Sequence, residues 1–115
     1  MKTEKFKVIQ FIRKLLIIID KNMENFLKKD IELKNKIRNN TYDLLETAYE
    51  ANSIEDVNIK NRLLNKMIAK VKVIDFLLNL TYDKQIITEK KYYKIGNKLD
   101  DIIKYITGWK NTLKK

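Results

Sequence analysis

The sequence predicts an all-α fold, an up-down-up-down four-helix bundle formed by a single domain over residues 1–115. Bulky apolar residues recur at alternating spacings of three and four along most of the chain, which is the period of a helix with one buried face. The chain has no proline, and neither a strand pattern nor a linker rich in glycine and serine interrupts this periodicity. With 115 residues, of which 44% are hydrophobic, the chain is large enough for one core and too small for two.

The clearest helical pattern lies near the carboxy terminus, over residues 92–113. Its apolar residues share one face, and they are Tyr92, Ile95, Leu99, Ile102, Ile106, Trp109 and Leu113. Thr88 is a candidate N-cap for this helix, and Glu89 places negative charge at its positively polarised end. Gly96 and Gly108 lie within the helix, where each costs about 1 kcal/mol relative to alanine. We therefore expect another backbone to approach both glycines closely, and we expect Gly108 and Trp109 to anchor the helix.

Three further helices are predicted over about residues 4–27, 30–52 and 54–80. The expected buried stripe of the first helix is Ile9, Ile12, Leu16, Ile19, Met23 and Phe26. That of the second is Ile37, Thr41, Leu44, Ala48 and Ala51, and that of the third is Val57, Leu64, Met67, Val71, Ile74 and Leu78. Ser53 is expected to end the second helix and start the third, and residues 81–85 are expected to form the turn into the last helix.

Several apolar residues lie off these stripes. A single bundle would leave Phe11 and Ile18 of the first helix, and Val73 and Phe76 of the third, in water. We therefore expect these four residues at contacts between copies of the chain in a homo-oligomeric ring. Scattered exposed apolar residues on a monomer are the alternative.

Two tyrosines on another side of the second helix, Tyr42 and Tyr49, are seven residues apart. Aromatic residues at helical spacing usually pack against a neighbouring helix, and we expect this of both side chains. Stacking on nucleic-acid bases is the alternative.

Charge is the strongest bulk property of the sequence. There are 25 Lys and Arg residues against 15 Asp and Glu, a net charge of +10, which favours a polyanionic partner such as RNA or DNA. Candidate phosphate-binding residues are Arg62, Lys66 and Lys72 in the third helix and Lys104 in the last. Because lysine presents a mobile point charge, we expect low sequence selectivity. The alternative is that the lysines are solvent-exposed residues on the outer faces of the helices and have no role in binding.

The residues needed for most catalytic and metal sites are missing. The chain has no histidine and no cysteine, which removes the commonest general base, the thiol nucleophile and the usual transition-metal ligands. Asp43, Glu46 and Glu50 follow helical spacing, but a solvated acidic face explains them better than an active site. We therefore expect no enzyme activity, no cofactor and no metal.

No part of the sequence has the pattern of a membrane span or a signal peptide. The longest apolar run, residues 15–19, is far shorter than the roughly 20 residues that a membrane-spanning helix needs, and nearby charges argue against a signal peptide. We expect a cytoplasmic protein without membrane contact. A basic amphipathic first helix lying on anionic lipid is the alternative.

The segment over residues 101–110, DIIKYITGWK, resembles the carboxy-terminal signature of the Avd family, the accessory variability determinants of diversity-generating retroelements. That signature has an acidic residue, an isoleucine, a basic residue, an apolar pair, and then Gly-Trp followed by a basic residue. Shorter likenesses occur at Leu33, Lys36, Ile37, Leu44, Leu45, Glu46, Ala51, Asn52, Leu77, Leu78, Leu80, Ile87, Thr88 and Tyr92, so the resemblance covers about residues 8–111. The chain departs from the family in lacking a proline between the first two helices and in having Asp75 and Asn79 where relatives carry arginines, whereas Lys104 keeps the positive charge.

The resemblance implies a non-catalytic, basic four-helix bundle that assembles into a pentameric ring. It further implies binding to the retroelement reverse transcriptase and its template RNA, which supports mutagenic complementary DNA synthesis. The nearest competitor is a related set of four-helix proteins encoded by intervening sequences in large-subunit ribosomal RNA genes. The third hypothesis is a basic oligomer that binds nucleic acid or a protein partner outside either family.

Overall fold

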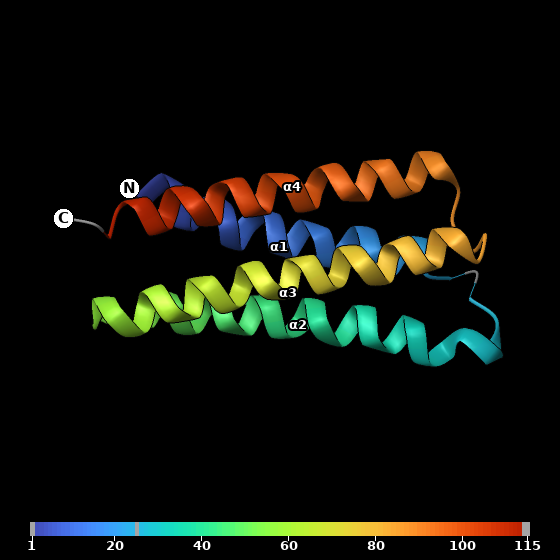
Figure 1. The fold of residues 1–115 in the computed structure, drawn as a ribbon, viewed down its shortest axis with the longest axis horizontal. Helices are drawn as coiled ribbons and strands as arrows, with labels where there is room; N and C mark the ends of the chain where they lie inside the picture. Colours follow the sequence, from blue (N-terminus) through green and yellow to red (C-terminus); the bar gives the residue numbers. More distant parts are fainter. Residues whose placement is uncertain (1, 25, 114–115) are drawn as a thin grey trace.

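The computed structural model describes the backbone of residues 2–24 and 26–113, and the side chains of residues 7–24 and 26–113. Within these ranges the protein has four α-helices, one short 3-10 helix and no strand (Figure 1). In chain order the elements are α1 (Lys2–Asn22), η1 (Lys28–Asp30), α2 (Ile31–Ser53), α3 (Val57–Asp83) and α4 (Glu89–Asn111). The predicted all-α architecture of four helices is confirmed.

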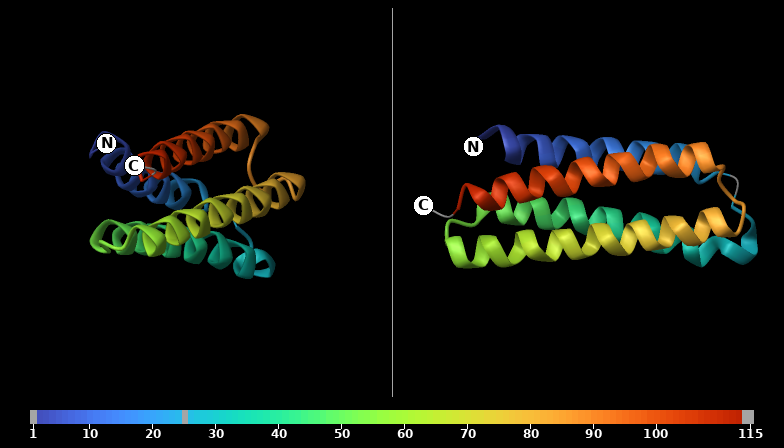
Figure 2. Two further views of the ribbon diagram at one scale, coloured as in Figure 1. Left: turned by 60° about the vertical axis from the view of Figure 1, so that its left-hand side comes forward. Right: turned by 45° about the horizontal axis from the view of Figure 1, so that its top comes forward.

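The helices run alternately in opposite directions along a molecule 47 Å long (Figures 1 and 2). α1 packs beside α2 and α4, and α3 also packs beside α2 and α4. α1 and α3 therefore occupy opposite corners of the bundle. None of these helices, over the residues described, is long and apolar enough to cross a membrane.

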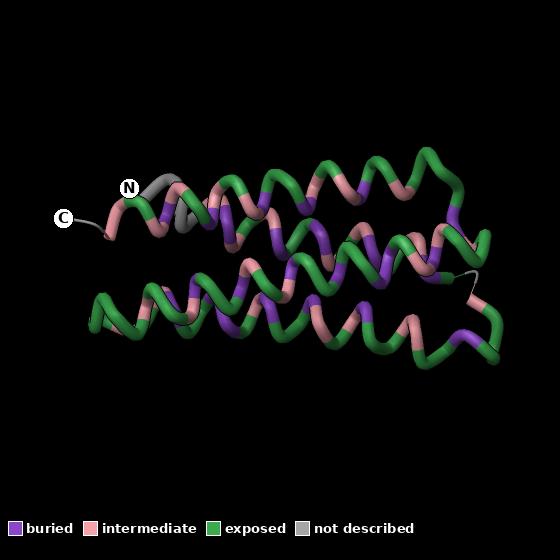
Figure 3. The backbone as a smooth tube through the Cα atoms, in the orientation of Figure 1, coloured by how far each residue is buried: buried purple, intermediate pink, exposed green. Residues whose placement is uncertain are grey.

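One hydrophobic core runs along the centre of the bundle, where the inward-facing turns of all four helices are buried (Figure 3). The stripe predicted for the second helix is buried in full, as are the five residues of α4 between Ile95 and Trp109 that were expected in the core. Tyr92 and Leu113, at the ends of that stripe, are half-buried. In α3 the predicted stripe is also buried, except for Val57 at its first position, which is 50% exposed.

The predicted stripe of α1 is wrong by one residue at two positions. Val8 and Leu15 are buried in the core, whereas Ile9 and Leu16 are half-buried on the flank of the helix. The cause is that apolar residues occupy both positions of each pair. The spacing therefore fits two faces that lie about 100° apart around the helix.

The first helix also ends earlier than expected, at Asn22 rather than near residue 27. The side chain of Asn22 donates a hydrogen bond to the Ile18 carbonyl oxygen at 2.7 Å. Leu27 has an extended backbone and is 60% exposed, so it lies in the connection to α2 rather than in a helix.

The junction between α2 and α3 uses a different cap from the one predicted. The Ser53 hydroxyl donates back to the Glu50 carbonyl oxygen within α2, at 3.0 Å. Asp56 instead caps α3, because its carboxylate accepts a hydrogen bond from the Ile59 backbone N–H at 3.0 Å. α3 therefore begins at Val57, three residues later than the prediction.

The junction between α3 and α4 also lies later than predicted. α3 continues to Asp83 and the turn follows, with Gln85 in the left-handed region at φ 62°. The predicted Thr88 cap is confirmed, since its hydroxyl oxygen accepts a hydrogen bond from the Lys91 backbone N–H at 3.2 Å.

The expectation of close backbone approach is wrong for Gly96. A β-carbon added there would meet no atom within 4 Å. Packing within the chain therefore does not explain why a glycine occupies this helical position.

We predict that Trp109→Ala destabilises the protein by about 3 to 5 kcal/mol, because Trp109 is only 3% exposed and its removal leaves a large cavity. Thermal unfolding followed by circular dichroism measures the effect. Tyr93→Ala is the matched control, since this second aromatic residue of α4 is 60% exposed and its loss should change the melting temperature little. Equal melting temperatures for the two variants would show that Trp109 does not anchor α4.

Candidate functional surfaces

The four basic residues singled out from the sequence are all exposed, three on α3 and one on α4. Within the described part of the chain, no ion pair involves Arg62, Lys66, Lys72 or Lys104. Helical geometry nevertheless places the three residues of α3 on two different sides of that helix. Arg62 and Lys66 are one turn apart on the same side of α3, whereas Lys72 follows Asn65 by two turns. Because the Asn65 side chain accepts a hydrogen bond from Lys110 of α4, Lys72 lies on the flank of α3 that faces α4.

The acidic side of α2 lies close to part of this basic surface. The Lys70 ammonium is 3.6 Å from the Asp43 carboxylate, which shows that this flank of α3 faces α2. Lys66 precedes Lys70 by one turn, and Asp43 is followed along α2 by the exposed Glu46 and Glu50. These carboxylates lower the positive potential around Lys66, so Arg62 is the stronger phosphate candidate of the two.

The four apolar residues assigned to contacts between copies fall into two groups. Val73 and Phe76 are 46% and 61% exposed on the outer side of α3, as a single bundle was expected to leave them. Phe11 and Ile18 are half-buried and pack against the core, and the Phe11 ring lies 5.2 Å from the Tyr105 ring of α4. The expectation that one bundle leaves this second pair in water is therefore wrong, because α4 covers that side of α1.

Other apolar side chains are exposed on α1 and α2. Tyr42 and Tyr49 of α2 are each 47% exposed, so the expectation that a neighbouring helix covers them is wrong. Ile17 of α1 is 58% exposed and borders a cleft of about 510 Å³ with Arg13 and Lys14. About half of each of these three side chains is open to solvent in the described chain.

A small acidic and aromatic pocket of about 190 Å³ lies between α3 and α4. Its lining is Asp75, Tyr92, Tyr93, Gly96, Asn97 and Asp100. Burial, and next the charge of Asp100, raises the pKa of the Asp75 carboxyl above its ordinary value. Burial and the charge of Asp75 likewise raise the pKa of Tyr92, whose ring stacks on Tyr82 at a centroid distance of 5.2 Å. The two carboxylates and two phenols of this lining can hold a proton or a positively charged group.

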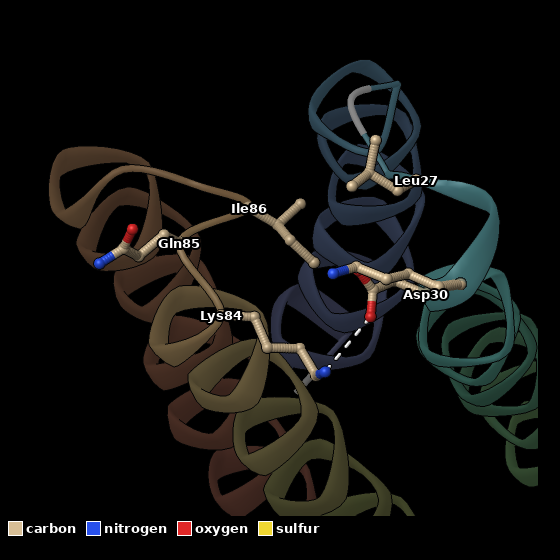
Figure 4. A pocket seen from close by; sticks show the side chains of 6 residues that line it. Leu27, Asp30, Lys84, Gln85 and Ile86 are labelled. Atoms are coloured by element: carbon tan, nitrogen blue, oxygen red, sulfur yellow. Dashed lines mark ion pairs between the residues drawn. The ribbon is translucent and has the colours of Figure 1, made fainter.

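A second pocket, of about 390 Å³, lies at the end of the bundle where the connections before α2 and α4 meet (Figure 4). Asp30 is only 7% exposed, and one of its carboxylate oxygens lies 3.3 Å from the ammonium of Lys84. Leu27 and Ile86 also line this pocket (Figure 4). The ion pair joins the two connections and gives the buried carboxylate a partner, which is a structural role.

The sequence analysis missed a further group of lysines on α1 and α4. Lys7, Lys14 and Lys21 are spaced by seven residues along α1, and Lys94 and Lys98 precede Tyr105 on α4. The Lys7 ammonium lies 3.5 Å from the Tyr105 hydroxyl oxygen and 5.0 Å from its ring centroid. The regular spacing on α1 was visible in the sequence, but which helix lies beside it was not.

The described residues contain no group of three or more carboxylates that could hold a metal ion. Comparison with protein-family models, with curated proteins and with solved structures found no match for this chain. The resemblance to the Avd family therefore stays a prediction.

We predict that Asp75→Asn raises the melting temperature at pH 7. A carboxyl whose pKa is raised on folding favours the folded state at low pH, and this contribution is lost as the pH rises through the folded-state pKa. The advantage of the variant should therefore shrink as the pH falls through the folded-state pKa of Asp75, and it should vanish below about pH 4, where the carboxyl is protonated in both folded and unfolded chains.

Asp101→Asn is the control, because it makes the same change in net charge from an exposed position outside the pocket lining. Melting curves recorded from pH 3 to pH 8 test the prediction. Two variants with the same pH dependence would show that the pocket does not destabilise the charged form of Asp75.

Proposed function

We propose that this protein is a non-catalytic accessory protein of a diversity-generating retroelement, which binds the reverse transcriptase and template RNA and supports mutagenic complementary DNA synthesis. The observation that carries the proposal is the setting of the segment over residues 101–110, on which the resemblance rests. It lies on the last of four helices, and its Trp109 is buried in the core. The position of this segment in the fold therefore supports the family resemblance in addition to its sequence.

The surface supports a partner with many negative charges. The net charge is +10, and Arg62, Lys66, Lys72 and Lys104 are all exposed. In a ring of identical copies such residues recur around the axis and sum to a belt of positive potential. Such a belt attracts a phosphate backbone without reading its sequence.

The exposed apolar residues support contact between copies. Val73 and Phe76 lie on the outer side of α3, where no other element of the described chain covers them. Burying a large aromatic side chain at the centre of an interface contributes strongly to association. We propose a homo-oligomer with Val73 and Phe76 in the contact, and a pentamer is the state that the family resemblance implies.

The direct test uses the reverse transcriptase encoded beside this gene, if one is found next to a pair of near-identical repeats. The purified protein should bind that enzyme and its template RNA, and should increase complementary DNA synthesis in a reaction that contains both. The absence of such a gene, or synthesis that is unchanged by the protein, would contradict the retroelement function.

We predict that Phe76→Glu splits the assembly while circular dichroism shows unchanged helical content. A charge at a buried contact costs desolvation energy, whereas the same charge at an exposed position of one bundle costs little. Light scattering at tens of micromolar measures the mass. Tyr49→Glu, at an exposed aromatic residue of α2, is the control and should leave the mass unchanged. A parent protein that is already a monomer would rule out the proposed contact.

We predict that the double variant Arg62→Gln and Lys66→Gln binds single-stranded RNA more weakly than the parent. Because Lys66 faces the acidic side of α2, we expect the loss of about one phosphate contact. This lowers the slope of log affinity against log salt by about 0.7. Fluorescence anisotropy titrations at several salt concentrations measure the slope. An unchanged slope would place the phosphate contacts elsewhere.

A further inference from the structure

The side of the bundle formed by α1 and α4 carries two rows of lysines, which we call the lysine face. It comprises Lys7, Lys14 and Lys21 of α1 and Lys94 and Lys98 of α4. α1 and α4 pack against each other. Figures 1 and 2 show the two helices close together at the start of α1 and the end of α4 and further apart toward the start of α4. The two rows therefore lie on the same side of the bundle.

Contacts between α1 and α4 fix which flank of each helix takes part. Lys7 and Phe11 of α1 both touch Tyr105 of α4, through the ammonium contact at 3.5 Å and the ring contact at 5.2 Å. Lys14 follows Lys7 by seven residues, or about two helical turns, and so lies on the same flank.

The same reasoning places the lysines of α4. Lys98 precedes Tyr105 by seven residues, and Lys94 lies about one turn earlier still. Neighbouring lysines within the α1 row are about 10 Å apart along the helix, and the axes of packed helices are about 8 to 10 Å apart. The charges are therefore separated by about one Debye length at moderate salt, and they repel one another.

Few acidic groups offset this repulsion. Within the described residues, no ion pair involves Lys14, Lys21, Lys94 or Lys98. Asp101, which lies one turn before Tyr105 on α4, offsets only part of the charge. A row of like charges held on rigid helices is relieved by a polyanion, because binding also releases the counterions of that polyanion.

Aromatic rings lie between the two rows. Phe11 and Tyr105 are half-buried, and the ammonium of Lys14 lies 5.6 Å from the centroid of the Phe11 ring. A partly exposed ring beside cations suits an unpaired base, which can stack on it while its phosphates meet the lysines. The bases of a duplex are already stacked within the double helix and are out of reach of these rings.

We propose that the lysine face binds single-stranded nucleic acid through its phosphate backbone, with Phe11 and Tyr105 as contacts for unpaired bases. The proposal rests on the proposed nucleic-acid binding and assigns it to a different surface from Arg62 and Lys66. It makes the lysine face the main site and the α3 residues a secondary one.

The test compares two double variants that lower the net charge equally, from +10 to +8. One removes Lys14 and Lys98 as Lys14→Gln and Lys98→Gln, and the other is the Arg62→Gln and Lys66→Gln variant. The probe is a polyuridine of about 16 nucleotides, the upper range of a single-strand site. Circular dichroism melting confirms that each variant is folded.

We expect the lysine-face variant to lose two phosphate contacts, which lowers the salt slope by about 1.4 and the affinity roughly 10- to 100-fold at 50 mM salt. In the Arg62→Gln and Lys66→Gln variant, the slope of log affinity against log salt should fall by about half as much. We also expect the parent to bind the single strand more tightly than a duplex of the same length.

Three results would overturn the assignment while leaving the proposed nucleic-acid binding intact. They are an equal or larger loss in the Arg62 and Lys66 variant, an unchanged salt slope in the lysine-face variant, and tighter binding of the duplex. A parent that binds no oligonucleotide at low salt would overturn both proposals. Binding of vesicles of phosphatidylserine and phosphatidylcholine by such a parent, lost in the lysine-face variant, would identify the lysine face as a lipid-binding surface instead.

Discussion

Burial of one apolar face on each helix holds this molecule together, because helices in water owe most of their stability to packing rather than to intrinsic propensity. The four long helices have 21, 23, 27 and 23 residues, and each contributes at least four buried hydrophobic side chains to a single core. No disulfide or metal-binding cysteine is available to replace that packing, since the chain has no cysteine. Everything proposed for the surface depends on this core, since it fixes which flanks of the helices lie side by side.

The sequence predicted the buried face of a helix correctly where the apolar residues fit only one helical spacing pattern. In α2 and α4 a single spacing pattern exists, and the residues from Ile37 to Ala51 and from Ile95 to Trp109 that were expected to be buried are buried. In α1 the adjacent apolar pairs at positions 8–9 and 15–16 allowed two faces, and only the position of the other helices selects one. Helix caps were ambiguous for a similar reason. Ser53 and Asp56 are both good N-cap residues, and the choice between them follows from where the chain leaves α2.

The surface was harder to predict than the core. Exposed lysines are not required to pack against other residues, so their spacing in the sequence does not show which of them lie together. Arg62 and Lys66 were recognised as one patch from spacing within one helix, and the structure keeps them together. Lys72 was grouped with them, but it lies on the flank of α3 that faces α4. The lysine face was missed because it combines residues more than 70 positions apart in the sequence, and their adjacency exists only after α1 and α4 have packed.

The placement of α1 and α3 at opposite corners has a consequence for avidity. The lysine face lies along α1 and α4, whereas Val73 and Phe76 lie on the outer side of α3, so contact between copies through α3 leaves the lysine face uncovered. Each added copy would then add an exposed lysine face without covering the lysine face of its neighbour. If the proposed assembly and nucleic-acid binding hold, a strand held by one copy would be presented to the next at a high effective concentration, and the whole assembly would bind far more tightly than any single copy. Long single strands would gain from this multivalency, and strands too short to reach a second copy would not.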